Sequence, residues 1–110
     1  MIFDKEGTTT IVQQDKTDLP GFLENLKKAY PKLGNDNLII NLFSFRKLTA
    51  NDLLEFLDLS NAHRTKGKSF VLVSDLISYG DIPDEISLVP TIGEAKDLIE
   101  MEEIERDLEL

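Results

Sequence analysis

Two short apolar stretches decide the fold: Leu-Ile-Ile-Asn-Leu at residues 38–42 and Ser-Phe-Val-Leu-Val at residues 69–73. Turn-forming residues precede both, with Gly-Asn-Asp-Asn at 34–37 before the first and Gly67 before the second. Near-continuous apolar runs of this length are typical of strands covered on both faces, as in a parallel sheet flanked by helices. We therefore expect both stretches to form central strands.

Helices are predicted before and between these strands. From residue 19 to residue 33 the apolar positions recur at the i, i+3, i+4, i+7 spacing of one helical face. Asp18 or Thr17 can cap the start, and Pro31 with the turn that follows it is expected to end the helix. A second helix is expected to start at the capping-box pattern of residues 49–52 and to run to about Lys66, just before Gly67.

The remaining elements are shorter. Residues 1–4 and 8–14 are expected to form a hairpin, and residues 86–89 a last strand. A capping box at 91–94 opens a final helix over 95–107, whereas 74–85 could form only a short helical turn. The order predicts one α/β domain over residues 1–110, with an N-terminal antiparallel hairpin, parallel central strands, and helices packed against the mixed sheet.

Composition narrows the class of protein. The chain has 110 residues, of which 41% are hydrophobic and 30% charged, and it has no cysteine. These values are typical of a folded globular domain without disulfides or cysteine metal sites. The apolar runs are far shorter than a membrane span, and the first residues lack the features of a signal peptide. We therefore expect a cytoplasmic protein with no membrane contact.

The net charge of −9 disfavours binding to nucleic acids. The basic cluster of Arg64, Lys66 and Lys68 is interpreted as residues that interact with the last carbonyls of the second helix. His63 is the only histidine, and it is expected to be solvated near the same helix end. A multi-histidine metal site is therefore excluded, and we expect no catalytic residue, no metal and no cofactor.

The final helix carries two apolar stripes. The second is rotated from the first by about a third of a turn, because each helical residue advances by about 100°. The first stripe comprises Ala95, Leu98 and Ile99, and the second comprises Met101, Ile104 and Leu108. The second is a possible secondary contact: after a bend it docks elsewhere, it contacts another subunit, or it frays. Acidic neighbours within 94–110 favour a basic partner and oppose self-association.

The order of elements and three stretches resemble the STAS domain, which anti-sigma factor antagonists share with sulphate transporters. Residues 37–42 resemble its apolar strand, and residues 63–73 resemble its helix end, glycine and following strand. Residues 89–95 resemble its last strand and the start of its final helix. Residues 13–18 depart from the family pattern near the first helix, and 74–85 is shorter than the usual third helix.

In regulatory members of the family, a serine at the start of the helix after the central strand is phosphorylated by a partner kinase. Ala50 occupies the corresponding position here, so the usual acceptor is replaced. Thr49 is a possible substitute acceptor, although a role as helix cap also accounts for it. The resemblance implies a partner-binding surface around this helix start. Its expected residues are Phe45, Thr49, Ala50, Asn51, Asp52, Leu53 and Phe56.

The leading hypothesis is therefore a non-catalytic regulatory module that docks a protein such as an anti-sigma factor or a kinase-like regulator. The apolar arc of the second helix is wide, because Phe56 and Leu59 extend the face made by Leu53, Leu54 and Leu57. Part of it could contact a partner, or all of it could pack internally.

One alternative is an accessory subunit of a separate enzyme. Short chains that resemble this one are sometimes labelled ribonuclease Z, an activity that needs a histidine-rich metal site. Another is a self-associating structural module, with a homodimer not favoured.

Overall fold

The computed structural model describes residues 1–109, and in this part of the chain five strands form one sheet in the order β1-β2-β3-β4-β5. β1 and β2 pair antiparallel, and β2 to β5 are parallel to one another. The predicted α/β fold with a mixed sheet is therefore confirmed. The strands are β1 (Ile2–Glu6), β2 (Thr9–Gln13), β3 (Asn37–Asn41), β4 (Phe70–Val73) and β5 (Ser87–Val89).

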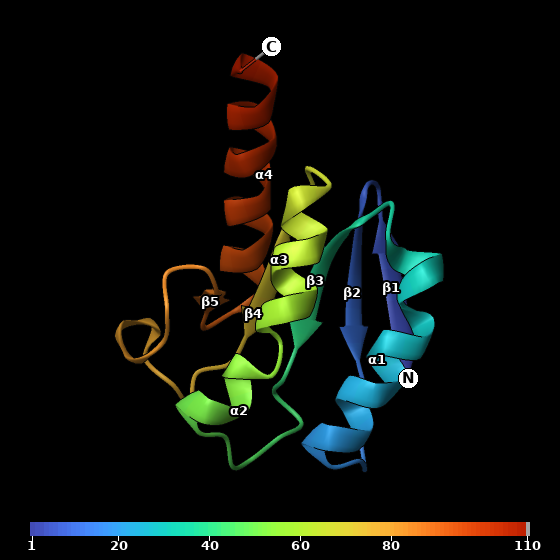
Figure 1. Ribbon diagram of the computed structural model, residues 1–110, viewed down its shortest axis with the longest axis vertical. Helices are drawn as coiled ribbons and strands as arrows, with labels where there is room; N and C mark the ends of the chain where they lie inside the picture. The colour runs from blue at the N-terminus through green and yellow to red at the C-terminus, as the bar shows by residue number, and fades with distance from the viewer. Residues whose placement is uncertain (110) are drawn as a thin grey trace.

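Helices cover both faces of the sheet (Figure 1). They are α1 (Leu19–Leu33), α2 (Ala50–Leu54), α3 (Leu57–Thr65), the short 3-10 helix η1 (Tyr79–Asp81) and α4 (Ile92–Leu108). Every connection from β2 to β5 steps to the next strand in the same direction, so right-handed crossovers put α1, α2 and α3 on one face. α4 follows the last strand and packs on the opposite face.

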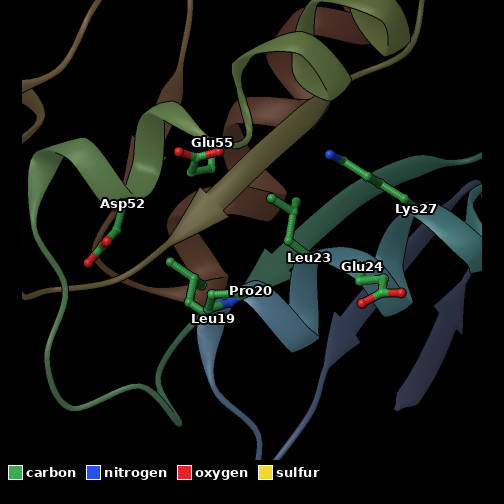
Figure 2. Close-up of a pocket in the computed structure, with 7 residues that line it drawn as sticks. All are labelled: Leu19, Pro20, Leu23, Glu24, Lys27, Asp52 and Glu55. Carbon is green, nitrogen blue, oxygen red and sulfur yellow. The ribbon is translucent and has the colours of Figure 1, made fainter.

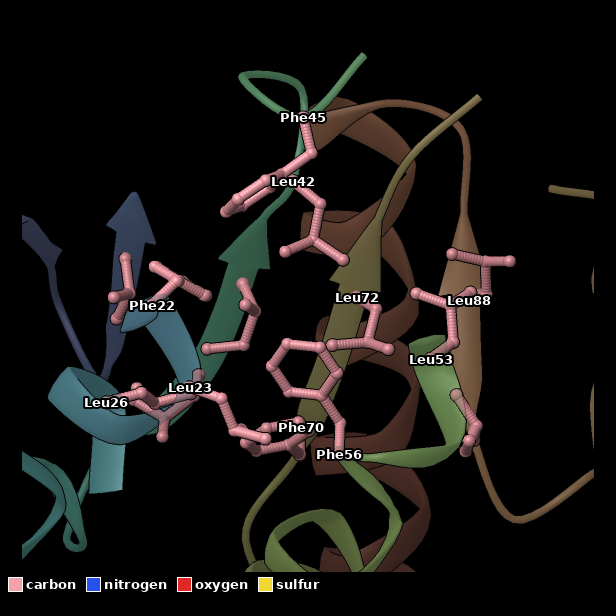
Figure 3. Packing of buried hydrophobic residues seen from close by; sticks show 14 of the residues in the cluster. Phe22, Leu23, Leu26, Leu42, Phe45, Leu53, Phe56, Phe70, Leu72 and Leu88 are labelled. Atoms are coloured by element: carbon pink, nitrogen blue, oxygen red, sulfur yellow. The ribbon is translucent and has the colours of Figure 1, made fainter. Parts of the chain in front are cut away.

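β3 and β4 supply both cores, as their apolar sequences predict. Alternate residues of a strand point to opposite faces, so neighbouring side chains enter different cores. The side chains of these strands that face α1, α2 and α3 are Leu38, Ile40, Phe70 and Leu72. Those that face α4 are Ile39, Val71 and Val73. Figure 3 shows the first core, in which Phe22 of α1 packs its ring edge-on to Phe45 at 5.5 Å and lies 6.3 Å from Phe56.

The single helix predicted over 49–66 is wrong, because the chain turns between α2 and α3. The amides of Glu55 and Phe56 donate to carbonyls three residues back, at 3.3 and 3.1 Å, which tightens the chain at this point. The turn brings both Leu53 and Phe56 into the core, where each is fully buried. A change of direction thus allows an apolar arc wider than one helical stripe to be buried.

α1 ends at Leu33, just before the turn at Gly34 as predicted, and Pro31 lies inside its last turn. A proline in the last turn removes only one helical hydrogen bond, and burial of Leu33 draws the last turn against the sheet. Gly67 does mark the end of α3, as expected. Its φ of +80° is a left-handed conformation that a glycine adopts without strain, and its amide donates to the Arg64 carbonyl at 2.9 Å.

The first prediction concerns the core between α1 and the α2–α3 turn. Phe56→Ala should lower the free energy of unfolding by about 3–5 kcal/mol, because it leaves a cavity against Phe22. Phe43→Ala is the matched control; Phe43 is 46% exposed, and the loss should be within about 1 kcal/mol. Urea unfolding measures both, and equal losses would contradict the packing described.

Candidate functional site

A groove of about 440 Å³ lies between the first half of α1 and α2. In Figure 2 the apolar side chains come from α1, and two carboxylates come from α2 and its end. The lining residues are Leu19, Pro20, Leu23, Glu24, Lys27, Asp52 and Glu55. The groove therefore has an apolar wall on α1 and an acidic wall on α2.

Helix caps hold the two walls in place. At the start of α1, Asp18 Oδ1 accepts a hydrogen bond from the Gly21 amide at 2.8 Å. At the start of α2, Thr49 Oγ1 accepts from the Asp52 amide at 3.2 Å, and Asp52 Oδ2 accepts from the Thr49 amide at 2.9 Å. This is the predicted capping box, with aspartate in the usual place of glutamate. It fixes the position of the Asp52 side chain, which lines the groove.

The charge around the groove is mainly negative. Glu24, Asp52 and Glu55 contribute three carboxylates, against the one ammonium group of Lys27. Lys28 also lies 3.3 Å from Glu24, but both side chains are exposed, so this ion pair contributes little. An apolar wall beside carboxylates suits an apolar segment that carries basic residues at its flanks.

The structure divides the predicted docking residues into two groups. Phe45, Leu53 and Phe56 are core residues with exposures of 8%, 0% and 0%. Their side chains offer a partner no contact surface, and this part of the prediction needs correction. The others lie at the start of α2, where Thr49 and Asn51 are exposed and Ala50 and Asp52 are half-buried. Asp52 alone among the predicted residues lines the groove.

The α1 wall was missed by the sequence prediction. Leu19 and Leu23 follow the helical period of the core-facing stripe, and Leu23 is indeed buried. The available signal was their place at the N-terminal end of the stripe, next to Pro20 and Glu24, where the apolar face meets charged residues. Only the position of α2 makes that end one wall of a groove.

His63 is fully buried, which corrects the expectation of a solvated side chain. Its Nε2 lies 2.7 Å from the Asp36 carbonyl oxygen, and its Nδ1 lies 2.7 Å from the Tyr30 hydroxyl. Because a carbonyl can only accept, Nε2 carries the proton and Nδ1 accepts from Tyr30. Both ring nitrogens are engaged inside the protein, so His63 serves to join α3, α1 and the loop before β3.

Burial lowers the pKa of His63 below its ordinary value of 6.5. The hydrogen bond to the Asp36 carbonyl and the negative charge of Asp36 act in the opposite direction, and the positive charges of Lys66 and Lys68 lower the pKa further. Lys66 Nζ donates to the Tyr30 hydroxyl at 3.2 Å and lies 4.8 Å from the centre of its ring. A positive charge on His63, next to the positive charge of Lys66, would therefore be poorly tolerated.

The basic cluster was expected to interact with the last carbonyls of the second helix. In the structure, the side chains of Arg64 and Lys66 contact other groups. The Lys66 side chain contacts Tyr30. Arg64 donates to Ser87 Oγ at 2.7 Å and to a Glu102 carboxylate oxygen at 3.5 Å. Arg64 thus links α3 to β5 and α4, and the charges of Arg64 and Lys66 are directed toward side chains of neighbouring elements.

α4 is one uninterrupted helix from Ile92 to Leu108, so neither the bend nor the fraying considered for its end occurs there. Leu110, the last residue of the acidic segment 94–110, lies outside the described residues. Met101, Ile104 and Leu108 are 59%, 53% and 80% exposed. The second apolar stripe therefore faces solvent.

Comparison with known proteins gives no assignment: no family model matches the chain, and no curated protein matches it either. Across residues 1–109, no helix is apolar and long enough to cross a membrane. In the same residues, no group of three or more metal-binding side chains could hold an ion. The family resemblance rests on residues 37–42, 63–73 and 89–95 and on the order of elements.

The second prediction tests the cap of α2. Thr49→Ala should lower the free energy of unfolding by about 1 kcal/mol, because the Asp52 amide loses its acceptor. Thr49→Ser, which keeps the hydroxyl, should stay close to the wild-type value. Urea unfolding compares the two variants, and a serine variant as unstable as the alanine variant would argue against the capping role.

The third prediction concerns pH. The unfolded chain takes up a proton on His63 near pH 6.5, whereas the folded protein resists it until a lower pH. Stability linked to His63 is thus complete above the ordinary pKa and declines as the pH falls below it. Between about pH 7.5 and about pH 5.5, the wild type should lose more stability than His63→Gln. Urea midpoints at both pH values measure this difference, and equal losses in the two proteins would contradict it.

Proposed function

We propose that the protein is a non-catalytic regulatory module of the bacterial cytoplasm, similar to anti-sigma factor antagonists, which docks a partner protein in the groove between α1 and α2. The partner class is an anti-sigma factor or a kinase-like regulator. The proposal draws on the STAS resemblance, which implies docking at the start of the helix after the central strand. That helix is α2, which follows β3.

The observation that carries the proposal is the pairing of an apolar wall with an acidic wall. Burial of Leu19 and Pro20 under a partner would supply affinity, because removal of apolar surface from water is the main driving force of association. Asp52 and Glu55 would orient the partner and raise its association rate through charge complementarity. The partner's contacting segment should therefore be apolar at its centre and basic at its flanks.

The groove is also preorganised for binding. The capping box fixes Asp52 before any partner arrives, and the buried side chains of Leu53 and Phe56 fix α2 on the core. Little conformational entropy is then lost on docking, which favours affinity for a given contact area. Phe45, Leu53 and Phe56 thus support the surface from below, and the contacts themselves fall to α1 and to the exposed residues of α2.

Thr49 as a phosphoacceptor stays a prediction. Its hydroxyl oxygen already accepts a hydrogen bond from the Asp52 amide, and the Asp52 carboxylate accepts a hydrogen bond from the Thr49 amide at 2.9 Å. A phosphate on Thr49 would bring further negative charge next to this carboxylate and would disturb the cap. Phosphorylation would therefore act by loosening the start of α2.

The fourth prediction tests the groove by charge reversal. Glu24→Lys and Glu55→Lys should each weaken binding of a purified anti-sigma partner by about tenfold, because they remove attraction and add repulsion. Glu85→Lys makes the same charge change at an exposed position outside the groove, and it should bind nearly as well as the wild type. The partner is first recovered by pull-down from the native host, and calorimetry then measures affinity.

NMR locates the contact independently. Amide shifts in the labelled protein should change along 19–27 and 49–57 when the partner is added. If the shifts change elsewhere, or if the three charge reversals weaken binding equally, the groove is not the docking surface.

A further inference from the structure

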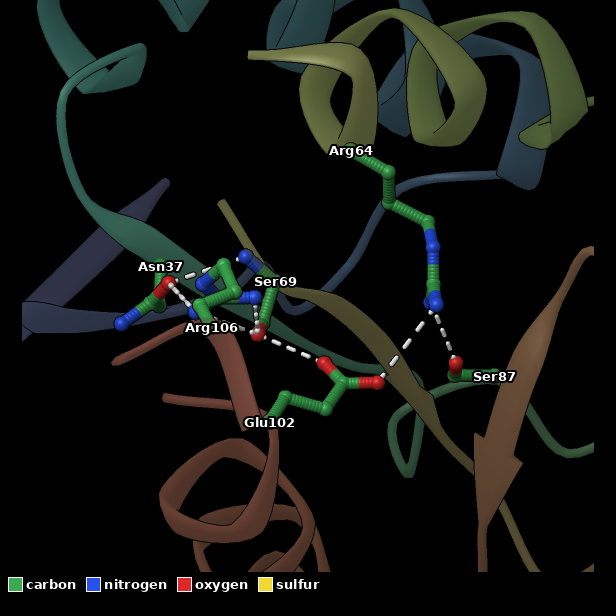
Figure 4. A network of polar contacts seen from close by, with 6 residues as sticks. All are labelled: Asn37, Arg64, Ser69, Ser87, Glu102 and Arg106. Carbon is green, nitrogen blue, oxygen red and sulfur yellow. Dashed lines mark hydrogen bonds and ion pairs between the residues drawn. The ribbon is translucent and has the colours of Figure 1, made fainter. Parts of the chain in front are cut away.

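The C-terminal half of α4 is oriented with charged residues toward the protein and apolar residues toward solvent. Figure 4 shows Glu102 and Arg106 at the amino ends of β3 and β4. Ser69 Oγ donates to Glu102 Oε1 at 2.6 Å, and Arg106 donates to Ser69 Oγ at 3.2 Å. Arg106 also reaches Asn37 Oδ1 at 3.5 Å. These bonds fix the rotation of the helix about its axis.

This rotation explains why the second apolar stripe is exposed. Residues 102 and 106 lie one turn apart on the inner side, whereas Met101, Ile104 and Leu108 lie on the side away from Ser69 and Asn37. The three outer residues span two helical turns, about 10 Å along the axis. Fraying does not account for their exposure, because the helix is continuous and anchored at this level.

Acidic residues border the stripe. The neighbours on either side within the helix are Asp97, Glu100, Glu105 and Asp107, all exposed. The two basic residues of α4 are engaged elsewhere: Lys96 Nζ contacts Glu6 Oε1 at 3.1 Å, and Arg106 binds Ser69 and Asn37. The outer face of the helix therefore presents a narrow apolar line between carboxylates.

We infer that this face, made of Met101, Ile104 and Leu108 with their acidic border, binds a basic amphipathic helix of a partner protein. An apolar line at i, i+3 and i+7 spacing matches the apolar stripe of a second helix laid alongside it. Lysine or arginine residues next to that stripe would meet the carboxylates. This surface lies on the opposite side of the sheet from the α1–α2 groove, so the inference goes beyond the proposed function.

The charge of this face favours a basic helix over a second copy of the chain as its occupant. Two copies paired along the stripe would bring the carboxylates of both α4 helices together, and like charges across an interface oppose association. An anionic membrane surface would be repelled for the same reason. A basic helix is the occupant for which both the apolar line and its border are favourable.

The fifth prediction uses a synthetic helical peptide of about 18 residues, long enough to span the stripe, with leucine along one face and lysine on the other. The peptide should bind the protein and shift the amides of residues 97–108 in NMR. The double variant Ile104→Gln/Leu108→Gln should weaken binding about tenfold or more, because it removes the apolar contact and keeps the charge and helix propensity. Leu76→Gln/Tyr79→Gln is the matched control; these residues are exposed apolar side chains outside α4, and binding should be unchanged.

Three results would overturn the inference. Equal binding of a peptide with the same composition but scrambled order would show that charge alone is responsible. Undiminished binding to the Ile104→Gln/Leu108→Gln variant would exclude the stripe. A dimer in sedimentation that this variant abolishes would assign the face to a second copy. Glu24→Lys should leave peptide binding at α4 unchanged, so failure here and failure of the groove proposal are distinguishable.

Discussion

The amino ends of β3 and β4 are joined by one buried residue, Asn37, through its side chain and its backbone. The side-chain oxygen Oδ1 of Asn37 accepts a hydrogen bond from the backbone amide of Ser69 at 2.9 Å, and the backbone amide of Asn37 donates to the Thr8 carbonyl at 2.8 Å. Asn37 therefore joins the hairpin turn and both central strands at one level, and the residue is 2% exposed. Because a buried polar group without partners is costly, these bonds set the strand ends in register. Arg106 and Glu102 then attach α4 to the same point, so the direction of the outer face of α4 depends on it.

The central strands and the helix starts were predictable because their signals are local. Residues 38–42 and 69–73 are apolar enough to require cover on both faces, and the structure buries them in two cores. The caps at Asp18, Thr49 and Thr91 each satisfy an amide within three residues along the chain. Such interactions need no knowledge of the tertiary structure, so the sequence indicates them directly.

The errors concern features that tertiary contacts determine. His63 occurs in a polar stretch, but its ring is enclosed by Tyr30, Asp36 and Phe70, which come from three other parts of the chain. The turn at Glu55 and Phe56 is likewise set by the fit of Phe56 against α1. A helical period assumes a straight axis, and it therefore assigned Phe56 to a possible surface arc. The groove was not predicted, and of its lining only Asp52 was among the predicted residues, because the groove depends on where α2 packs against α1.

The strand order also bears on where a partner can bind. In open α/β sheets, ligands usually bind where successive connections leave the sheet on opposite faces and open a crevice at the carboxyl ends of the strands. Here the connections between β2 and β5 step in one direction, and the helices α1, α2 and α3 share a face. The topology therefore favours recognition by helix surfaces. Each of the two surfaces proposed here combines apolar side chains with carboxylates, and one lies on each side of the sheet. With a net charge of −9, copies of this chain repel one another at long range, and this repulsion supports the proposal that both surfaces bind basic partners.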